Sequence, residues 1–254
     1  MGMEGSDRPE IQIVEDKKVE EREPGASRHG NFKNYYKFHP AEERVRQLPR
    51  GLWQLRKNER KYNALDVGCN AGNLTIELHK FLKEELSIDT DIQILGIDLD
   101  SNLIERARAN TSDPSIHFEC LDFFTEIRET AICSYLKELE REKFDVVFCF
   151  SITMWIHLNH GDEGLVKFLE EICQMTEMLV IEPQPWNCYR KASRRMRRGG
   201  EEDFPLINKL KLTGRMERHV EKIVCGEKCA FRQITTTQDN NWGRKILIFQ
   251  RKQL

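Results

Sequence analysis

Short, continuous apolar runs alternate along most of the chain with stretches in which apolar residues recur at helical spacing. The continuous runs are rich in β-branched and aromatic residues, as is typical of buried strands. Strands that alternate with helices form a parallel sheet covered on both faces. The pattern therefore predicts an α/β fold with seven strands and helices on both faces of the sheet. The predicted strands span 63–67, 91–97, 116–120, 144–150, 178–182, 231–236 and 245–250.

Helices are predicted in the intervals between these strands. The last two strands are close enough in sequence to form a hairpin, so one antiparallel strand is expected in an otherwise mostly parallel sheet. Ser101 is the expected N-cap of one helix, because it directly precedes a run of apolar residues at helical spacing. The predicted helices lie within 74–82, 103–107, 127–141, 164–175 and 216–224.

The first 28 residues lack such a pattern and are rich in acidic side chains, which predicts a disordered tail over 1–28. We expect residues 29–254 to form one domain, with the segment 29–60 acting as a lid over the edge of the sheet. A formal net charge of −2 excludes a histone-like polycation. No apolar run is long enough to span a membrane, and no apolar signal sequence is present at the N-terminus.

Eight cysteines, several of them inside apolar runs, are typical of free thiols in a reducing compartment. We expect the cytoplasm, and the nucleus stays open as an alternative. Cys225 and Cys229 are four residues apart, but no second pair of Cys or His lies nearby. We therefore expect no metal site.

Unusual residues follow the predicted strands, where ligands bind in open α/β sheets. Gly68 belongs to the turn DVGCNAG after the first strand, where glycines allow the backbone to approach a ligand closely. Asp98 ends the second strand and can accept hydrogen bonds from both hydroxyls of a ribose. Asp122 and Phe123 follow the third strand and can receive the amino group and the face of an adenine. Together these residues predict a cofactor that contains adenosine.

The turn DVGCNAG resembles the first motif of class I S-adenosylmethionine-dependent methyltransferases, which have a Rossmann-like fold. Asn70 departs from the commoner pattern, which has glycine at this position, but its side chain can still reach the methionine end of the cofactor. The G-x-x-x-G spacing is not that of dinucleotide sites, and the Gly-Lys-Ser/Thr ending of phosphate-binding loops is missing. S-adenosyl-L-methionine is therefore the expected cofactor.

Three longer motifs, in order, resemble the Bicoid-interacting-3 domain family from about residue 30 to residue 249. They are GNFKNYY before the domain, SITMWIHLNHGD after the fourth strand and EPQPW after the fifth. Members of this family methylate 5′-terminal phosphates of RNA. One branch caps the γ-phosphate of a small nuclear RNA, and the other acts on a 5′-monophosphate.

The residue at position 154 favours the monophosphate branch. The capping branch has a lysine there, which can balance the extra charge of a triphosphate, whereas Met154 cannot. The stretch FHPAEERVRQLP also looks closer to the monophosphate branch. The resemblance implies a methyltransferase that acts on the 5′-monophosphate of a transfer RNA or a small-RNA precursor. The alternatives are γ-phosphate capping, a small-molecule or protein methyltransferase, and a non-catalytic RNA-binding scaffold.

The family pattern implies roles for the residues around the site. No general base is expected, because a phosphate monoester is already anionic at pH 7 and needs only positioning and desolvation. Arg44 can pair with the methionine carboxylate if its segment packs on the site. Glu182 would repel a phosphate, so we expect it to pair with an arginine or a base. The implied cofactor contacts are Arg44, Gly68, Asn70, Asp98, Asp122, Phe123 and Phe150, and the phosphate contacts are Tyr35, Tyr36, Ser151 and His157.

Each phosphate contact has a simpler alternative. Tyr35 and Tyr36 can instead pack the N-terminal segment, and His157 can be structural. A basic run follows the EPQPW motif and is a candidate RNA-binding surface, with a solvated helix face or a nuclear-import signal as alternatives. As a helix it would be basic on most sides. Its basic residues are Arg190, Lys191, Arg194, Arg195, Arg197 and Arg198.

Overall fold

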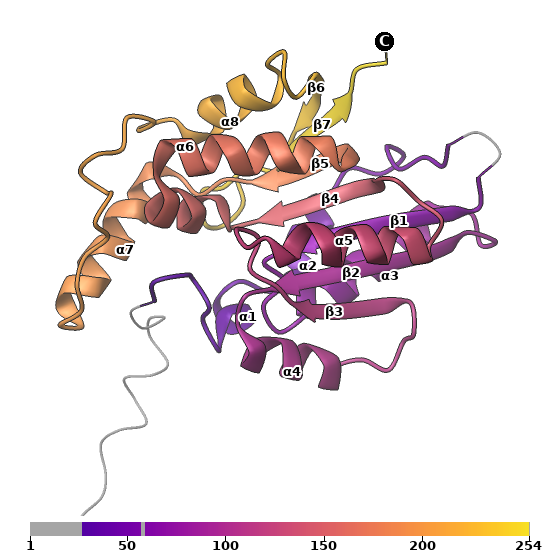
Figure 1. The fold of residues 1–254 in the computed structure, drawn as a ribbon, viewed down its shortest axis with the longest axis horizontal. Helices are drawn as coiled ribbons and strands as arrows, with labels where there is room; N and C mark the ends of the chain where they lie inside the picture. The colour runs from indigo at the N-terminus through magenta and orange to yellow at the C-terminus, as the bar shows by residue number, and fades with distance from the viewer. Residues whose placement is uncertain (1–26, 57–58, 254) are drawn as a thin grey trace, which may run out of the picture.

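The computed structural model describes residues 27–56 and 59–253, which contain one seven-stranded sheet (Figure 1). The strand order is β3-β2-β1-β4-β5-β7-β6. Strands β1 to β5 are parallel, and β7 is antiparallel to both β5 and β6. The predicted Rossmann-like class I sheet, with its antiparallel strand, is confirmed. The strands span Lys61–Val67 (β1), Asp91–Asp98 (β2), Ile116–Cys120 (β3), Phe144–Phe150 (β4), Thr176–Glu182 (β5), Phe231–Thr236 (β6) and Leu247–Arg251 (β7).

Helices cover both faces of this sheet. One face carries α2, α3 and α4, and the other carries α5, α6 and α8. The carboxyl ends of the parallel strands point to the left in Figure 1, where α1 and α7 lie. The helices span Tyr35–Phe38 (α1), Ala41–Gln47 (α2), Asn73–Glu85 (α3), Ser101–Ala109 (α4), Ile127–Glu138 (α5), Thr153–Gln174 (α6), Trp186–Arg198 (α7) and Met216–Val224 (α8).

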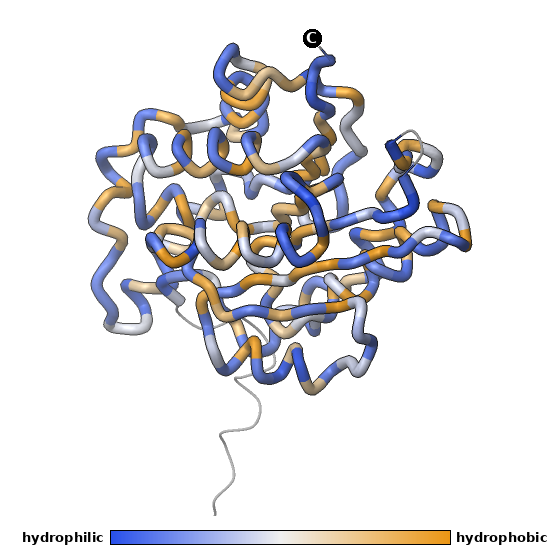
Figure 2. Tube along the Cα trace, turned by 45° about the vertical axis from the view of Figure 1, so that its right-hand side comes forward, coloured by the Kyte–Doolittle hydropathy of each residue, from blue (hydrophilic) through white to orange (hydrophobic). Residues whose placement is uncertain are grey.

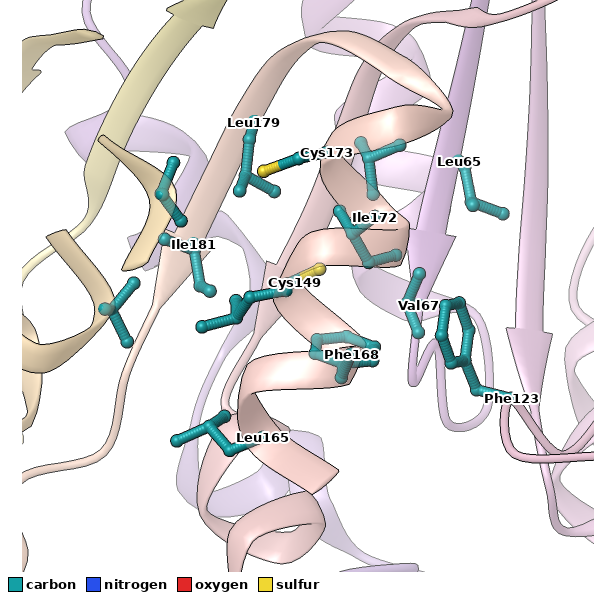
Figure 3. Close-up of a cluster of buried hydrophobic side chains, with 14 of the residues drawn as sticks. Leu65, Val67, Phe123, Cys149, Leu165, Phe168, Ile172, Cys173, Leu179 and Ile181 are labelled. Carbon is teal, nitrogen blue, oxygen red and sulfur yellow. The ribbon is translucent and has the colours of Figure 1, made fainter. Parts of the chain in front are cut away.

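Alternate residues of each buried strand enter two separate cores. Leu65 and Val67 of β1 pack under α6, whereas Ala64 packs under α3. Figure 3 shows the first of these cores, in which Phe168 and Ile172 of α6 lie over β1 and β4. Both faces of the central strands are apolar because both are covered. In Figure 2 these strands are largely orange, while the helices alternate between orange and blue.

The segment before β1 starts at the carboxyl edge of the sheet and then packs against the face that α3 covers. Trp53 is 3% exposed and its ring meets that of Phe81 edge-on, with centroids 5.2 Å apart. Tyr36 donates a hydrogen bond from its hydroxyl to the carbonyl of Cys69 in the glycine turn. The predicted tail lies outside the described residues except for Ser27 and Arg28. Arg28 already bonds the carbonyl of Glu202, so this residue belongs to the folded domain.

Three predicted details are wrong. Asp100, not Ser101, caps α4, since its carboxylate accepts hydrogen bonds from the backbone of Asn102 and Leu103. The helix predicted within 164–175 starts earlier: α6 begins at Thr153, inside the motif after β4, and Gly161 with φ 71° marks a kink in it. The basic helix α7 is not basic on most sides, because a full face of it is buried. That face consists of Tyr189, Ala192, Ser193 and Met196.

Candidate functional site

A cavity of about 350 Å³ opens at the carboxyl ends of the parallel strands, as expected for this fold. Residues from the glycine turn, from the ends of β2, β3 and β4, from α6 and from the N-terminal segment line it. Eight of the residues implied by the family pattern meet in this cavity. They are Tyr35, Gly68, Asn70, Asp98, Asp122, Phe123, Phe150 and Ser151.

The glycine turn brings backbone and carboxylate together at the centre of the cavity. Gly68 has φ 79° and Asn70 has φ 52°, a left-handed conformation that asparagine tolerates better than most residues. The backbone N–H of Asn70 donates to Asp98 Oδ2 at 2.9 Å. Burial raises the pKa of Asp98, and hydrogen bonds from the backbone of Asp100 and Asn70 act in the opposite direction. A hydroxyl donor would stabilise the ionised form of this carboxylate.

A second carboxylate and a set of rings form another part of the cavity wall. Asp122 Oδ1 accepts a hydrogen bond from the backbone of Phe124 at 2.9 Å, which holds the turn after β3. Phe124 stacks on His160 of α6, with ring centroids 3.7 Å apart and planes 12° apart. Phe123 is 7% exposed and also lines the cavity. These rings give this part of the cavity an aromatic wall beside the carboxylate of Asp122.

A buried charge cluster lies beside Ser151, where the cavity meets the N-terminal segment. Arg44 of α2 reaches Glu182, at the end of β5, through Nε and Nη2, both at 3.1 Å. Arg44 Nη2 also lies 2.7 Å from the hydroxyl of Tyr35 and 3.0 Å from Ser151 Oγ. Ser151 and Glu182 also contact a second arginine, Arg244. Its Nη1 is 2.6 Å from Ser151 Oγ and 3.3 Å from Glu182 Oε1.

The two arginines keep the buried carboxylate of Glu182 ionised. Burial alone would raise the pKa of Glu182, but the charges of Arg44 and Arg244 and the hydrogen bonds from Arg44 and Ser151 lower it below its ordinary value. The expected pairing of Glu182 with an arginine is therefore confirmed. Arg44 Nη1 is buried and has no hydrogen-bond partner among the described residues. Arg44 does not itself line the cavity, but its partners Tyr35 and Ser151 do.

Ser151 holds an unusual conformation at the centre of the cluster. Its φ of 57° is left-handed, and its backbone N–H donates to the carbonyl of Glu182 at 3.1 Å. Gln184, from the EPQPW motif, donates through Nε2 to the carbonyl of Ser151. Its Oε1 accepts a hydrogen bond from the backbone of Met154 at 3.1 Å. Met154 itself is 3% exposed and packs in the core, so it offers no group to the cavity.

Two of the four expected phosphate contacts are not brought to the cavity. His157 is fully buried, with Nδ1 3.1 Å from the hydroxyl of Tyr189 and Nε2 2.8 Å from Asp162 Oδ1. Both ring nitrogens therefore have protein partners, and we assign His157 a structural role that ties α6 to α7. Tyr36 is turned toward Cys69, and its hydroxyl is a packing contact of the glycine turn.

Sequence reasoning missed several residues of the site. Arg244 and Asn240 lie between β6 and β7, where no motif was recognised, although Asn-Asn-Trp-Gly is a turn sequence. Asn240 donates through Nδ2 to Glu182 Oε2 at 3.0 Å. Asn31 also lines the cavity, and its Nδ2 donates to Asp100 Oδ2 at 2.7 Å. Its position inside the GNFKNYY motif was the available signal.

The basic helix α7 lies at the same end of the sheet as the cavity (Figure 1). Its buried face packs on α6, and the ring of Tyr189 lies 4.7 Å from that of Trp186. The guanidinium of Arg195 lies 5.6 Å over the ring of Phe32 in the N-terminal segment. The other five basic side chains predicted to bind RNA, those of Arg190, Lys191, Arg194, Arg197 and Arg198, are exposed.

The part of the chain that the structure describes has neither a cluster of metal ligands nor a membrane-spanning helix. No group of three or more His, Cys, Asp or Glu side chains among these residues is placed to hold a metal ion. No helix within them is long and apolar enough to cross a membrane.

The chain is similar in sequence to proteins of known function. The sequence profile of the Bicoid-interacting protein 3 (Bin3) family matches residues 144–251, and a methyltransferase-domain profile matches residues 64–178. A pre-miRNA 5′-monophosphate methyltransferase from Xenopus laevis is 39% identical over 242 residues, which cover 90% of this chain and 94% of the relative. An RNA 5′-monophosphate methyltransferase from Bos taurus is 38% identical, with 91% and 83% covered. The solved N-methyltransferase NodS from Bradyrhizobium japonicum superposes with a TM-score of 0.47 at 16% identity, covering 76% of this chain and 79% of that one.

Proposed function

Because the chain belongs to the Bicoid-interacting protein 3 family and its relatives include RNA 5′-monophosphate methyltransferases, we propose that it methylates the 5′-monophosphate of an RNA. S-adenosyl-L-methionine would supply the methyl group, whose carbon–sulfur bond breaks as a phosphate oxygen attacks, leaving a neutral thioether. The acceptor oxygen is already anionic at pH 7, so no side chain has to remove a proton. The work of the protein is to position and desolvate the two partners.

The cavity fits this cofactor residue by residue. Asp98, at the end of β2, keeps lone pairs for the ribose hydroxyls after accepting two backbone hydrogen bonds. Asp122 and the rings of Phe123 and Phe124 would receive the adenine. The buried and unpartnered Nη1 of Arg44 would take the methionine carboxylate. The ribose, the adenine and the methionine carboxylate of the cofactor would thus each meet a group of this chain.

The acceptor phosphate would lie beside Ser151 and Tyr35, where the cavity meets the buried charge cluster. The Tyr35 hydroxyl, which accepts a hydrogen bond from Arg44, can donate its own to a phosphate oxygen while another oxygen stays free to attack, whereas the Ser151 hydroxyl already donates to Glu182 Oε1. Phe150 contributes an apolar surface at the same end of the cavity, which excludes water from the reacting atoms.

The RNA chain would leave the site along α7. Its exposed arginine and lysine side chains would contact successive phosphates without reading sequence, and this binding should weaken with salt. Arg195 is assigned differently from the others, because it contacts Phe32 and connects the helix to the segment over the cavity.

The observation that carries the proposal is the meeting of a cofactor-sized cavity and a buried pair of arginines at Ser151. The experiment is methyl transfer from labelled S-adenosylmethionine to one short RNA prepared with a 5′-hydroxyl, a 5′-monophosphate or a 5′-triphosphate. We expect label on the monophosphate alone. Label on the triphosphate alone would assign γ-phosphate capping instead. No label on any RNA, with S-adenosylhomocysteine still binding in calorimetry, would contradict an RNA 5′-phosphate acceptor.

A further inference from the structure

We propose that Arg244 is the side chain that binds the 5′-phosphate of the RNA, an inference that rests on the proposed function. Arg244 lies in the connection between β6 and β7, outside every motif recognised in the sequence. Its Nη1 is 2.6 Å from Ser151 Oγ, and Ser151 lines the cavity. The guanidinium therefore lies directly next to the wall against which the acceptor would be placed.

Arg244 has hydrogen-bonding capacity that the described residues do not use. Within the described chain its side chain bonds through Nη1 alone, to Ser151 and Glu182, and its buried Nε has no partner. A guanidinium has five N–H donors in a planar fork, and a buried donor without an acceptor is costly. A phosphate can accept two of these donors at once. The unpartnered Nε is therefore the independent sign that an anion belongs here.

The loop 240–244 is built to keep Arg244 in this position. Asn240 Oδ1 accepts hydrogen bonds from the backbone of Trp242 at 3.0 Å and of Arg244 at 2.9 Å. Trp242 packs on His39 with ring centroids 4.7 Å apart, and His39 stacks on Tyr35 at 4.8 Å. The loop is thus fixed on one side to β5, through Asn240 and Glu182, and on the other to the N-terminal segment. An arginine held in advance loses little freedom when it binds its ligand.

Arg44, the other arginine of the cluster, is less available to the phosphate. It bonds Glu182 through two nitrogens and its side chain is 0% exposed, whereas that of Arg244 is 11% exposed. The two arginines and Glu182 together carry a net charge of +1, which attracts an anion to this end of the cavity. His39 adds no charge near pH 7, because burial and the charges of Arg244 and Arg44 lower its pKa to about 4.

The test compares the binding of one RNA with a 5′-monophosphate and with a 5′-hydroxyl, in the presence of S-adenosylhomocysteine. The wild-type protein should prefer the phosphorylated RNA, and Arg244→Ala should reduce that preference by about 10- to 100-fold, with unchanged affinity for the hydroxyl form. Arg244→Lys should keep part of the preference, because it keeps the charge but loses the fork. Arg232→Ala, which removes an exposed arginine from the same hairpin, is the matched control and should keep the full preference.

The outcomes separate the two proposals. An Arg244→Ala protein that binds S-adenosylhomocysteine normally and keeps the wild-type preference overturns the role of Arg244 and leaves the proposed function intact. A wild-type protein that neither prefers nor methylates the phosphorylated RNA overturns the proposed function, and the role of Arg244 with it. Should Arg244→Ala fail to bind S-adenosylhomocysteine, Arg244→Gln decides between the same outcomes, since it fills more of the space.

Discussion

Arg44 and Glu182 are 138 positions apart in the sequence and form an ion pair in which both side chains are completely buried. The pair joins α2 of the N-terminal segment to the carboxyl end of β5. Arg44 donates to both carboxylate oxygens of Glu182, and Ser151, Asn240 and Arg244 donate the other hydrogen bonds to this carboxylate. Removing either charge of such a buried pair destabilises the fold, because the remaining ion is left without a counter-charge and without water to solvate it.

Replacing Glu182 by Gln should therefore destabilise the protein strongly. The change keeps the shape of the side chain but leaves Arg44 and Arg244 facing each other without a counter-charge. We expect the free energy of unfolding to fall by about 3–5 kcal/mol in urea titrations. Glu84→Gln is the control, since Glu84 pairs with Arg50 on the surface and its loss should cost less than about 1 kcal/mol. Equal losses for the two variants would contradict this account.

The buried carboxyl of Asp66 should make stability depend on pH. Burial raises the pKa of Asp66 to about 7, although a hydrogen bond from Thr75 acts in the opposite direction. The unfolded chain gives up this proton near the ordinary pKa of 3.8, so the stabilisation is complete below that pH and is lost as pH rises to about 7. The stability of Asp66→Asn relative to wild type should therefore increase from pH 4 to pH 8, by roughly 2–4 kcal/mol. A relative stability that does not change over this range would contradict the raised pKa.

Two glycines in the N-terminal segment provide a matched pair of substitutions. Gly30 and Gly51 both have positive φ, of 79° and 76°, so alanine is strained at either position. A Cβ on Gly30 would also lie 2.2 Å from Nε1 of Trp155, whereas nothing lies within 4 Å of a Cβ on Gly51. Gly30→Ala should displace the segment from the cavity and weaken S-adenosylhomocysteine binding in calorimetry by about tenfold or more, a loss of at least about 1.4 kcal/mol. Gly51→Ala should bind normally, and similar affinities for the two variants would argue against a segment closed over the site.

Charge reversal on α7 should weaken RNA binding and its dependence on salt. Arg194→Glu with Arg198→Glu changes two exposed side chains and leaves Arg195 on Phe32. We expect lower RNA affinity, with the slope of log K against log salt reduced by roughly one to two, and unchanged binding of S-adenosylhomocysteine. Lys80→Glu with Lys83→Glu is the control. These side chains are exposed on α3, which covers the opposite face of the sheet from α7. An unchanged salt slope in the α7 variant would exclude this helix from the RNA path.

The sheet and the cofactor end of the site could be predicted because both follow from local patterns. Apolar runs located the strands, and the residues directly after them, such as Asp98 and Asp122, were placed at one edge by the parallel topology alone. The orientation of His157 could not be predicted in this way. A polar residue on an apolar helix face can bind a ligand or belong to the core, and only its hydrogen-bond partners distinguish the two roles. The partners of His157 are Tyr189 and Asp162.

The charge cluster escaped prediction for a different reason. Arg244 and Ser151 are in contact although they are 93 positions apart in the chain, and no local sequence pattern predicts a contact between them. The pairing depends on β7 inserting between β5 and β6, which brings the loop 240–244 over the end of β5. The order of strands in the sheet determines this position of the loop. The sequence pattern predicted a hairpin but not the strand of the sheet with which the hairpin pairs.

The strand order β5-β7-β6 also has a consequence for the synthesis of the protein. Asn240 and Arg244 follow β1 to β5 in the sequence, and both bond Glu182, which is made earlier. While its C-terminal part is still inside the ribosome, the growing chain can form β1 to β5 but lacks two partners of its buried carboxylate. Domains become stable as their long-range contacts close. The charge cluster is thus assembled last, and a chain that ends before residue 240 lacks two of its members.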